Sequence, residues 1–392
     1  MNPAFYLCLC VLCTFGVVFG DYDWSSNPGD GTEGNPYQIS TAEQLALIGP
    51  DAALLDKHFI LTADIDMSAY TFDNSPIAPD TDQTNDTYAG ENRFSGTLDG
   101  KGHVIRDLTI SRSGTSYNIG LVGLTTSSIS SWEIKNLGVD NLTINVADSS
   151  KYLGGLVGRG YGGAVSSCYT SGSITSGDSC SRMGGLAGLA SATHISNCYA
   201  VCSVTNGTAS TLTGGAVGQY AASTGKLEKC YSTGTVSSGG TATSIGALVG
   251  ALYTGAQVVD CYFLDTAGPD NGIGTAKTIA LLKLRPTYTN WKFNGVILGN
   301  QGYWRMRDDQ YDYPYLEWEF VDGDFHGDFQ VDMLDLAEFS QCWLTDPDSF
   351  DFNYLCDLNK DGFINLDDFN IFCRNWLKII EFRRNFAILK GS

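Results

Sequence analysis

Positive charge is scarce in this 392-residue sequence: Lys and Arg number 23 against 43 Asp and Glu, which gives a formal net charge of −20. This balance argues against nucleic acid and anionic membrane as partners, because both attract basic proteins, and it favours solubility or cation binding. Between Val321 and Trp376 there are 13 acidic residues and only two basic ones, Lys360 and Arg374. That short acidic segment is predicted to be a separate domain.

Long apolar runs are absent after the first 20 residues, so no transmembrane segment is expected in the rest of the chain. Residues 1–20 are themselves apolar and end in Val18-Phe19-Gly20, a pattern that fits signal-peptidase cleavage. A membrane anchor at this end is the alternative reading. We predict a signal peptide, and therefore a secreted protein that is extracellular or associated with the cell surface.

The Cys-x-x-Cys and His spacings of zinc sites are absent after residue 20. Nine of the twelve Cys lie beyond that point, and four of these recur regularly in the middle of the chain, where they are read as small buried hydrophobes. Three more, Cys342, Cys356 and Cys373, lie in the acidic segment. A disulfide is plausible there, with Cys342 and Cys356 as one candidate pair, but the sequence leaves the pairing open.

Runs of good helix formers are also missing from the middle of the chain, where Gly, Ser, Thr and Val dominate, and helical hairpin arrays are therefore disfavoured. A repeat fills this region. A Gly-rich phrase is followed each time by a Cys-Tyr pair: 153–158 with Cys168-Tyr169, 183–188 with Cys198-Tyr199, 213–218 with Cys230-Tyr231, and 245–250 with Cys261-Tyr262. The pairs are 30, 32 and 31 residues apart, and a fixed period of about 20–50 residues is typical of a solenoid.

Side chains alternate after each of these cysteines. Cys198, Ala200 and Cys202 share one parity and are expected to point inward, whereas Tyr199 and Val201 have the outward parity. The position before each Cys, or its equivalent, is mostly a turn former suited to a corner: Asn136, Ser167, Asn197, Lys229 and Asp260. The pattern predicts a mainly β fold, a right-handed parallel β-helix in which equivalent residues form columns.

Both ends of the solenoid depart from the repeat. Residues 37–68 are expected to cap the first coil, with a short helix at Thr41–Leu45. Residues 70–91 are read as a polar surface loop. Residues 290–319 break the period, and their aromatic side chains are expected to close the far end.

The Gly-Gly-Leu-Val-Gly phrases resemble the GLUG motif of secreted bacterial β-helix proteins. Residues 39–45, 61–66 and 94–100 match the usual lead-in of that group, and residues 313–318 its exit. The resemblance covers about residues 35–320 and implies the fold rather than an activity. We therefore divide the chain into a signal peptide (1–20), a β-helix domain (21–320), an acidic domain (321–377) and a basic tail (378–392) with no assigned role.

The acidic domain contains a twelve-residue loop, 357–368, with the spacing of an EF-hand calcium site. Gly362 stands where the loop must turn sharply. The predicted ligands are the side chains of Asp357, Asn359, Asp361, Asn365 and Asp368 and the backbone carbonyl of Phe363.

A second such loop, 324–335, lies 33 residues earlier and departs twice from the pattern. His326 takes the third position, although an imidazole is a poor ligand for a hard cation, and Phe329 replaces the turn glycine. Weak calcium binding and a loop that keeps its shape without metal both stay open. Its candidate ligands are Asp324, His326, Asp328, Gln330, Asp332 and Asp335.

Each loop is followed by a predicted helix, 336–344 and 369–377, with Phe and Trp at equivalent places. This duplicated loop–helix unit, with Asp at position 12, resembles a type I dockerin over about residues 321–377. The resemblance implies calcium-dependent folding and attachment to a cohesin-like scaffold or surface protein. It also implies that positions 10 and 11 of each loop contact the partner: Met333, Leu334, Leu366 and Asp367.

The role of the β-helix itself stays open between three readings. The first is a glycan-binding face made by the outward column Tyr169, Tyr199, Tyr231 and Tyr262; the alternative for this column is that the rings only cover one another and the adjacent loops. The second is a polysaccharide lyase or glycoside hydrolase, which the fold suggests only by analogy. Adjacent coils could place Asp260 or Asp265 near Glu228, and Asp308-Asp309 is read as a solvated turn, but no catalytic cluster is evident. The third is an adhesin or passive spacer. We expect a secreted, calcium-dependent modular protein in polysaccharide binding or breakdown, more plausibly without catalysis of its own.

Overall fold

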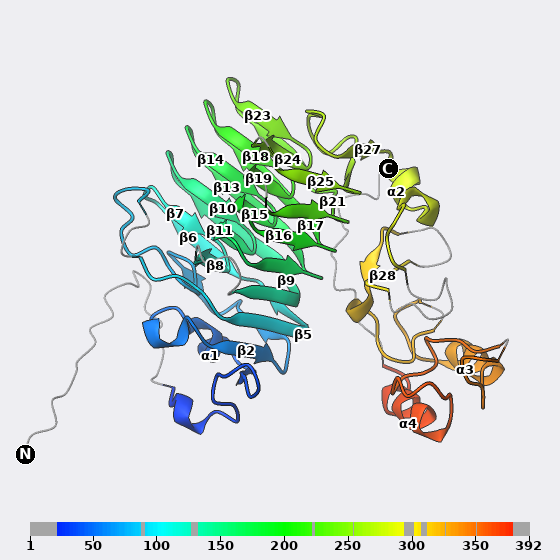
Figure 1. Ribbon diagram of the computed structural model, residues 1–392. Helices are drawn as coiled ribbons and strands as arrows, with labels where there is room; N and C mark the ends of the chain where they lie inside the picture. Colours follow the sequence, from blue (N-terminus) through cyan, green and yellow to red (C-terminus); the bar gives the residue numbers. More distant parts are fainter. Residues whose placement is uncertain are drawn as a thin grey trace, which may run out of the picture.

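The structure is a computed structural model that describes residues 22–378 apart from 88–90, 127–131, 222–223, 254, 294–301, 307–311, 326 and 350. The predicted signal peptide, His326, and the tail after residue 378 therefore lie outside the described residues. The chain is mainly β: a solenoid of about five turns is followed by a small helical region (Figure 1). The predicted parallel β-helix is confirmed.

Three parallel sheets line the coils. Five successive turns between Thr97 and Leu252 add strands to all three sheets, and the coils before and after them add strands to the largest sheet alone. The largest sheet contains β1 (Tyr37–Ile39), β2 (His58–Leu61), β3 (Ile65–Asp66), β4 (Thr71–Phe72), β5 (Thr97–Arg106), β6 (Thr109–Arg112), β9 (Glu133–Val146), β12 (Ala164–Ser166), β13 (Tyr169–Ser176), β16 (His194–Ser196), β17 (Tyr199–Asn206), β20 (Lys226–Glu228), β21 (Tyr231–Ser232), β22 (Val236–Ser238), β25 (Gln257–Val259), β26 (Tyr262–Leu264) and β27 (Thr275–Lys277). The second contains β7 (Tyr117–Ile119), β10 (Lys151–Gly154), β14 (Ser181–Gly184), β18 (Thr211–Gly214) and β23 (Thr243–Gly246). The third contains β8 (Val122–Leu124), β11 (Val157–Tyr161), β15 (Ala187–Ser191), β19 (Val217–Ala221) and β24 (Val249–Leu252).

The Gly-rich phrases make the corner between the second and third sheets. Leu153 of β10 is in register with Met183 of β14, which is in register with Thr213 of β18. A Cβ on Gly154 would lie 2.2 Å from the carbonyl oxygen of Val157 and 2.6 Å from the amide of Gly188. Glycine is needed there because the backbone of the next coil leaves no room for a side chain.

The cysteines form the inward column that the alternation predicts. Cys168, Cys198, Cys230 and Cys261 are buried in the solenoid core. The residue before each of these four cysteines adopts a left-handed conformation, and so does Asn136 before the equivalent Leu137. The angle φ lies between 50° and 52° at all five positions: Asn136, Ser167, Asn197, Lys229 and Asp260. These residues form the predicted corner, and Asn and Asp suit it because they tolerate positive φ.

The tyrosines also form a column. Tyr169 pairs with Tyr199, Tyr199 with Tyr231, and Tyr231 with Tyr262 in the strand register. The rings of Tyr169 and Tyr199 stack with centroids 4.9 Å apart, and those of Tyr199 and Tyr231 with centroids 5.0 Å apart. The predicted stacking of the coils along one axis is confirmed by this column.

The prediction of an exposed glycan-binding face is wrong, however, because all four tyrosines are buried. The described part of residues 290–320, which we call the closing segment, covers them. Its three tryptophans lie along the column and donate their indole N–H groups to the corner residues: Trp291 to the carbonyl oxygen of Asp260, Trp304 to Asn197 Oδ1, and Trp318 to the carbonyl oxygen of Ser167.

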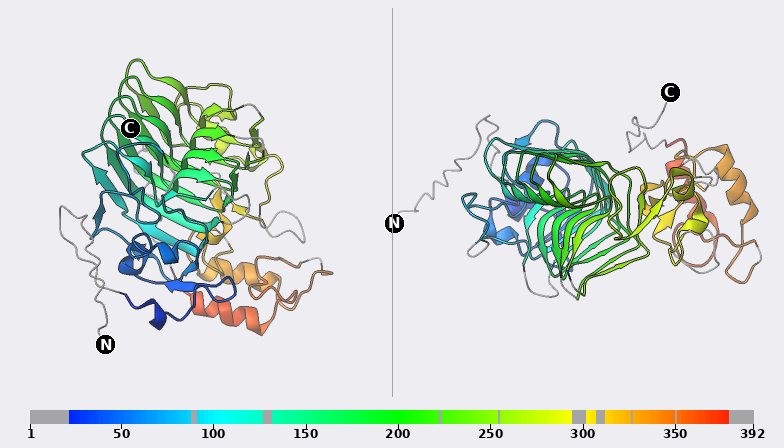
Figure 2. Two further views of the ribbon diagram at one scale, coloured as in Figure 1. Left: turned by 60° about the vertical axis from the view of Figure 1, so that its left-hand side comes forward. Right: turned by 90° about the horizontal axis from the view of Figure 1, so that it is seen from above.

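The closing segment does more than close the far end of the solenoid. Trp291 contacts Tyr262 of the last coils, whereas Trp318 stacks on Tyr169 and approaches Gly102 of β5 in the early coils. The segment therefore runs back along the side of the solenoid. It carries the helical region to a position beside the coils rather than beyond their end (Figures 1 and 2). Its strands β28 (Trp304–Arg305) and β29 (Tyr315–Leu316) form an antiparallel pair.

The N-terminal cap is formed as predicted around helix α1 (Ala42–Ala46), which Thr41 caps in a capping box with Gln44. The remaining helices are α2 (Ile279–Leu282), α3 (Met333–Gln341) and α4 (Leu366–Asn375), and the 3-10 turns are Trp24–Ser26, Ala52–Leu54, Arg285–Thr287 and Glu317–Glu319. No described helix has both the length and the apolar content needed to cross a membrane.

The insertion at 70–91 is only partly the expected surface loop. It contributes β4, and Ile77 and Asp80 are buried against the solenoid. The Asp80 carboxylate accepts hydrogen bonds from Asn118 Nδ2 and from the Asp82 amide. Burial nevertheless raises the pKa of Asp80 to about 7, and the nearby Glu91 adds to this rise.

The raised pKa of Asp80 leads to a prediction of how the stability of the chain changes with pH. Because its pKa is about 7 in the folded chain against 3.8 normally, the folded state holds a proton that the unfolded state releases. Stability should fall as pH rises from about 4 to about 7, by on the order of 2–4 kcal/mol. Denaturant unfolding at a series of pH values should show this fall, and Asp80→Asn should flatten it. Parallel pH profiles for both proteins would contradict the assignment.

Replacing one tyrosine of the column should lower the stability of the solenoid. Tyr199 stacks on two neighbours, and its hydroxyl donates to Glu319 Oε2 at 2.8 Å. Tyr199→Ala should reduce the free energy of unfolding by about 3–5 kcal/mol, as for other buried aromatic side chains. The control is Tyr253→Ala, since Tyr253 is 60% exposed and should change stability by less than about 0.5 kcal/mol. Similar losses in both variants would mean that the column is not covered.

Candidate metal centre and partner surface

Two loops of the same design lie in the acidic module (residues 321–377): loop 1 (324–335) and loop 2 (357–368). Helices α3 and α4 begin at Met333 and Leu366, three residues earlier than predicted. The predicted start is wrong because Asp332 and Asn365, at position 9 of each loop, act as N-caps. In each case the position-12 carboxylate completes a capping box, so the last positions of the loop form the first turn of the helix.

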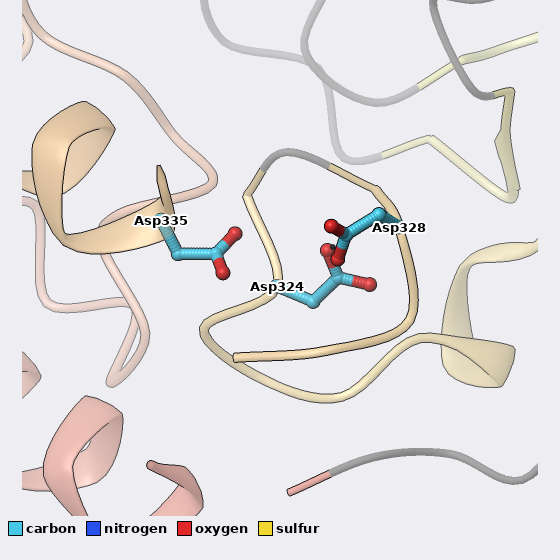
Figure 3. A group of neighbouring side chains, drawn as sticks. All are labelled: Asp324, Asp328 and Asp335. Atoms are coloured by element: carbon cyan, nitrogen blue, oxygen red, sulfur yellow. Dashed lines mark hydrogen bonds between the residues drawn. The ribbon is translucent and has the colours of Figure 1, made fainter. Parts of the chain in front are cut away.

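Three carboxylates converge in loop 1. Single oxygens of Asp324, Asp328 and Asp335 all lie within 4.8 Å of one another. Figure 3 shows Asp335 reaching from the start of α3 toward the turn that holds the other two. The Asp324 carboxylate accepts the backbone N–H groups of Gly327 at 2.6 Å, Asp328 at 3.1 Å and Phe329 at 2.9 Å. These bonds hold the loop wrapped around Asp324.

Loop 2 wraps around Asp357 in the same way. Its carboxylate accepts the N–H groups of Asp361 at 3.1 Å and Gly362 at 3.0 Å. Asp368 accepts those of Asn359 at 3.1 Å and Asn365 at 2.9 Å. Within the described residues the carboxylates of this loop do not form a triad as close as that of loop 1, although Asp357, Asp361 and Asp368 occupy the same three positions.

The donor set of both loops fits a hard cation. Asp324, Asp335 and Asp368 are fully buried, and Asp357 is 7% exposed. Burial raises the pKa of Asp324 to about 6, although Arg305 and the loop amides oppose the rise, and burial also raises the pKa of Asp357. Calcium prefers oxygen ligands of this kind, and its charge would offset the cost of burying these carboxylates.

The two halves of the module are bonded to each other reciprocally. Val331 of loop 1 exchanges backbone hydrogen bonds with Leu377 and Lys378, which follow α4. Ile364 of loop 2 does the same with Leu344 and Thr345 after α3. Phe339 and Phe372, the equivalent helix residues, stack in the module core with centroids 5.6 Å apart. Each loop therefore depends on the helix of the other half.

The turn position differs between the loops. Gly362 has φ +87°, and Phe329, its counterpart in loop 1, has φ +67°. A left-handed conformation costs a residue with a side chain roughly 1–2 kcal/mol. Phe329 adopts it nonetheless and is buried against Tyr315 and Phe320. The sequence marked this position as a departure from the loop pattern but held no sign of the contact.

The predicted partner-contact residues are exposed on the first turns of α3 and α4. Met333 is 65% exposed, Leu334 52% and Leu366 70%, and Asp367 is also exposed. Met333 and Leu366 occupy the same position in the two loops. Because each loop bonds to the residues that follow the helix of the other half, each helix start lies beside the end of the other helix. Large apolar side chains that remain in water at each helix start are typical of an interaction surface.

Two cysteines meet in the module core. Cys342 and Cys356 are buried thiols in one cluster, and Cys373 is exposed. The neighbouring Cys342 and burial both raise the pKa of Cys356. The structure thus brings together the pair that the sequence offered as one candidate for a disulfide, and the disulfide stays a prediction.

Carboxylates considered for catalysis on the solenoid are already engaged. Glu228 binds Lys226 at 2.5 Å and His194 at 3.2 Å. Asp260 Oδ2 accepts a hydrogen bond from Asn290. Asp308 and Asp309 lie outside the described residues. Glu228 thus takes part in surface ion pairs, and Asp260 takes part in the structure of a corner.

Comparison with known proteins places the module and the solenoid separately. Residues 322–375 match the family described as "Dockerin type I domain". The chain therefore contains a type I dockerin domain; such domains in general bind calcium and attach to cohesins, and proteins that carry them are typically extracellular or at the cell surface.

Two relatives match about a third of the chain. "Halomucin" of Haloquadratum walsbyi is 32% identical over 152 residues, which is 38% of this chain and 2% of the relative. A "Putative Gly-rich membrane protein" of Evansella cellulosilytica is 33% identical over 134 residues, 34% of this chain and 14% of the relative. The chain thus corresponds to only a small part of either relative.

One solved structure resembles the chain over most of its length. It is described as a "putative immunoglobulin A1 protease" from Bacteroides ovatus, with a TM-score of 0.51 and 20% identity, covering 74% of this chain and 94% of that one. At this level of identity the likeness extends to the fold alone.

Gly362 offers a direct test of loop 2. A Cβ there would have open space, with Pro347 Cγ the nearest atom at 4.0 Å, so the effect of Gly362→Ala comes from its positive φ. We expect calcium affinity to fall about five- to thirtyfold, the equivalent of 1–2 kcal/mol of backbone strain. Isothermal titration of the full chain measures this. The control is Gly240→Ala, where nothing lies within 4 Å; an unchanged affinity in Gly362→Ala would contradict the assignment.

Proposed function

We propose that this chain is a secreted modular protein in which a calcium-folded dockerin module attaches the β-helix to a cohesin-type scaffold or surface protein. The β-helix domain is taken as residues 21–320 and the module as 321–377. Two separate buried clusters support this division: one fills the solenoid and the other lies wholly within the module.

The observation that carries the proposal is the exposed apolar side chains at the two helix starts, each of which lies beside the end of the other helix. Met333, Leu334 and Leu366 remain in water although the module core is filled by other residues. An attachment surface of this kind gains most of its binding energy from a few large side chains that become buried on contact. Because type I dockerins bind cohesins, a cohesin-type module is the partner that this surface fits.

Calcium has a structural role in this proposal. The groups that would hold it are Asp357, Asn359, Asp361, the Phe363 carbonyl, Asn365 and Asp368 in loop 2, and Asp324, His326, Asp328, the Gln330 carbonyl, Asp332 and Asp335 in loop 1. When bound, the ion supplies the positive charge that buried carboxylates require. The protein itself holds the carboxylate at position 12 of each loop where it caps the following helix and also faces the loop.

In this proposal the solenoid is the domain that the module attaches to the scaffold. Support for an extracellular polysaccharide setting comes from the resemblance of its repeats to the GLUG motif and from the kind of proteins that dockerins attach. The burial of the tyrosine column takes away the aromatic face considered for glycan binding. A ligand surface on the solenoid, if it serves one, has to be built from other residues.

Charge placed on the attachment surface should abolish binding without unfolding the module. Met333→Asp with Leu366→Asp adds acidic groups at first helical positions, which tolerate negative charge. Affinity for a panel of recombinant type I cohesin modules, with calcium present, should fall at least about thirtyfold, the equivalent of 2 kcal/mol. Binding is measured by surface plasmon resonance, and removal of calcium with EGTA should abolish it.

The matched control for this test is Leu281→Asp. Leu281 is 41% exposed and lies in the first turn of α2, outside the module, where a negative charge is tolerated. It should bind cohesin as the unmodified chain does. Equal affinity of the double variant and the unmodified chain would rule out this surface.

A further inference from the structure

The module is packed against the solenoid's closing segment through loop 1. The ring of Phe329 stacks on Phe320 with centroids 4.9 Å apart and an interplanar angle of 11°, and it meets Tyr315 edge-on at 5.1 Å. All three side chains are buried in a cluster of their own, between the solenoid core and the module core. Phe329 is therefore one residue by which loop 1 contacts the closing segment.

A second contact reaches the first residue of the same loop. Arg305 is 7% exposed, and its guanidinium lies 4.3 Å from the ring centroid of Phe320. It donates a hydrogen bond to the backbone carbonyl of Asp324. Arg305 and Tyr315 are direct partners in the β28–β29 pair. One short hairpin of the closing segment thus contacts both the first and the sixth positions of loop 1.

The contact explains why a side chain stands at the turn of this loop. In loop 2 the turn residue is Gly362, with open space around it. In loop 1 the backbone has to take up a left-handed conformation at Phe329, which a side chain disfavours, and the amide of this same residue binds Asp324. Packing of the Phe329 ring against the closing segment stabilises that conformation, because the ring is buried there only when the turn is formed.

We propose that the closing segment of the solenoid is an integral part of the loop 1 metal site, so that calcium binding at loop 1 and docking of the module on the solenoid are coupled. Loop 2 is independent of this coupling, since the hydrogen bonds of its described residues stay within the module. The inference rests on the proposed calcium function and extends it. By linkage, calcium at loop 1 strengthens docking to the extent that docking strengthens calcium binding.

The consequence is an orientation that calcium controls. With loop 1 loaded, the attachment surface at Met333 and Leu366 is held at a set angle to the solenoid. With loop 1 empty and its turn relaxed, the module remains tethered but is free to turn about residues 320–323. Calcium at loop 1 therefore determines how the solenoid is oriented. This effect is separate from that of calcium at loop 2 on attachment to a scaffold.

The test is a calcium titration of the full chain followed by hydrogen exchange and mass spectrometry, which reports each loop separately. Protection of peptides that cover 322–332 follows loop 1, because its amides bond to Asp324. Protection of 357–364 follows loop 2. Phe320→Ala removes the solenoid's half of the ring stack without changing either loop.

Phe320→Ala should raise the calcium concentration at half-protection of loop 1 by about tenfold, within the usual range of coupling between sites, and leave that of loop 2 within about twofold. The matched control is Tyr303→Ala, an aromatic of the same segment that is 48% exposed and outside the cluster; it should shift neither loop. Phe329→Gly restores the common turn residue. In that background Phe320→Ala should no longer shift loop 1.

The outcomes separate the two proposals. Unmodified protein in which calcium protects neither loop would overturn the proposed function itself. Protection of both loops with no shift in Phe320→Ala would overturn only the coupling. Equal shifts in both loops would also overturn it, since they would reflect general destabilisation of the module. Should Phe320→Ala fail to fold, Phe320→Leu, which keeps an apolar side chain but loses the stack, is measured in the same way.

Discussion

The structure depends on one constraint: coils that stack in register place identical side chains directly over one another. For small residues such as Cys this fills the interior of the coil. For Tyr169, Tyr199, Tyr231 and Tyr262 it builds a wide aromatic row on the outer parity, which water solvates poorly. The row has to be covered. The closing segment does this with three tryptophans, each of which also satisfies its indole N–H at a corner of the coil.

Covering the row determines where the module lies. Because the tyrosines span several coils, the cover has to run back along the solenoid from Trp291 to Trp318. The chain therefore leaves the solenoid beside its early coils, next to the position where the dockerin module begins. The contacts of Arg305, Tyr315 and Phe320 with loop 1 follow from this path. The tyrosine column of the repeat is in this way connected, through the closing segment, to the geometry of loop 1, which lies far away in the sequence.

Much of this was predictable from the sequence, for reasons that differ between elements. The period, the inward cysteines and the left-handed corner at Asn197 follow from local alternation and turn chemistry, which a sequence displays directly. The loops follow from ligand spacing, and only the helix starts were misplaced, because Asp332 and Asn365 serve as both loop residues and caps. The burial of Tyr199 was one of two readings of the tyrosine column that the sequence left open, since alternation gives parity but not what packs outside the coil. Phe329 was noticed only as a poor turn residue, because its partners lie in an irregular segment with no pattern of its own.

The central claim, that the closing segment is packed on the tyrosine column, is tested most directly by a double-mutant cycle between Tyr231 and Trp304, whose ring centroids are 5.8 Å apart. Free energies of unfolding of the solenoid are measured for Tyr231→Leu, Trp304→Leu and the two together. The account predicts a coupling energy of about 0.5–1.5 kcal/mol, as for other aromatic pairs in contact. Additive effects of the two substitutions would show that the rings do not meet and would contradict the account.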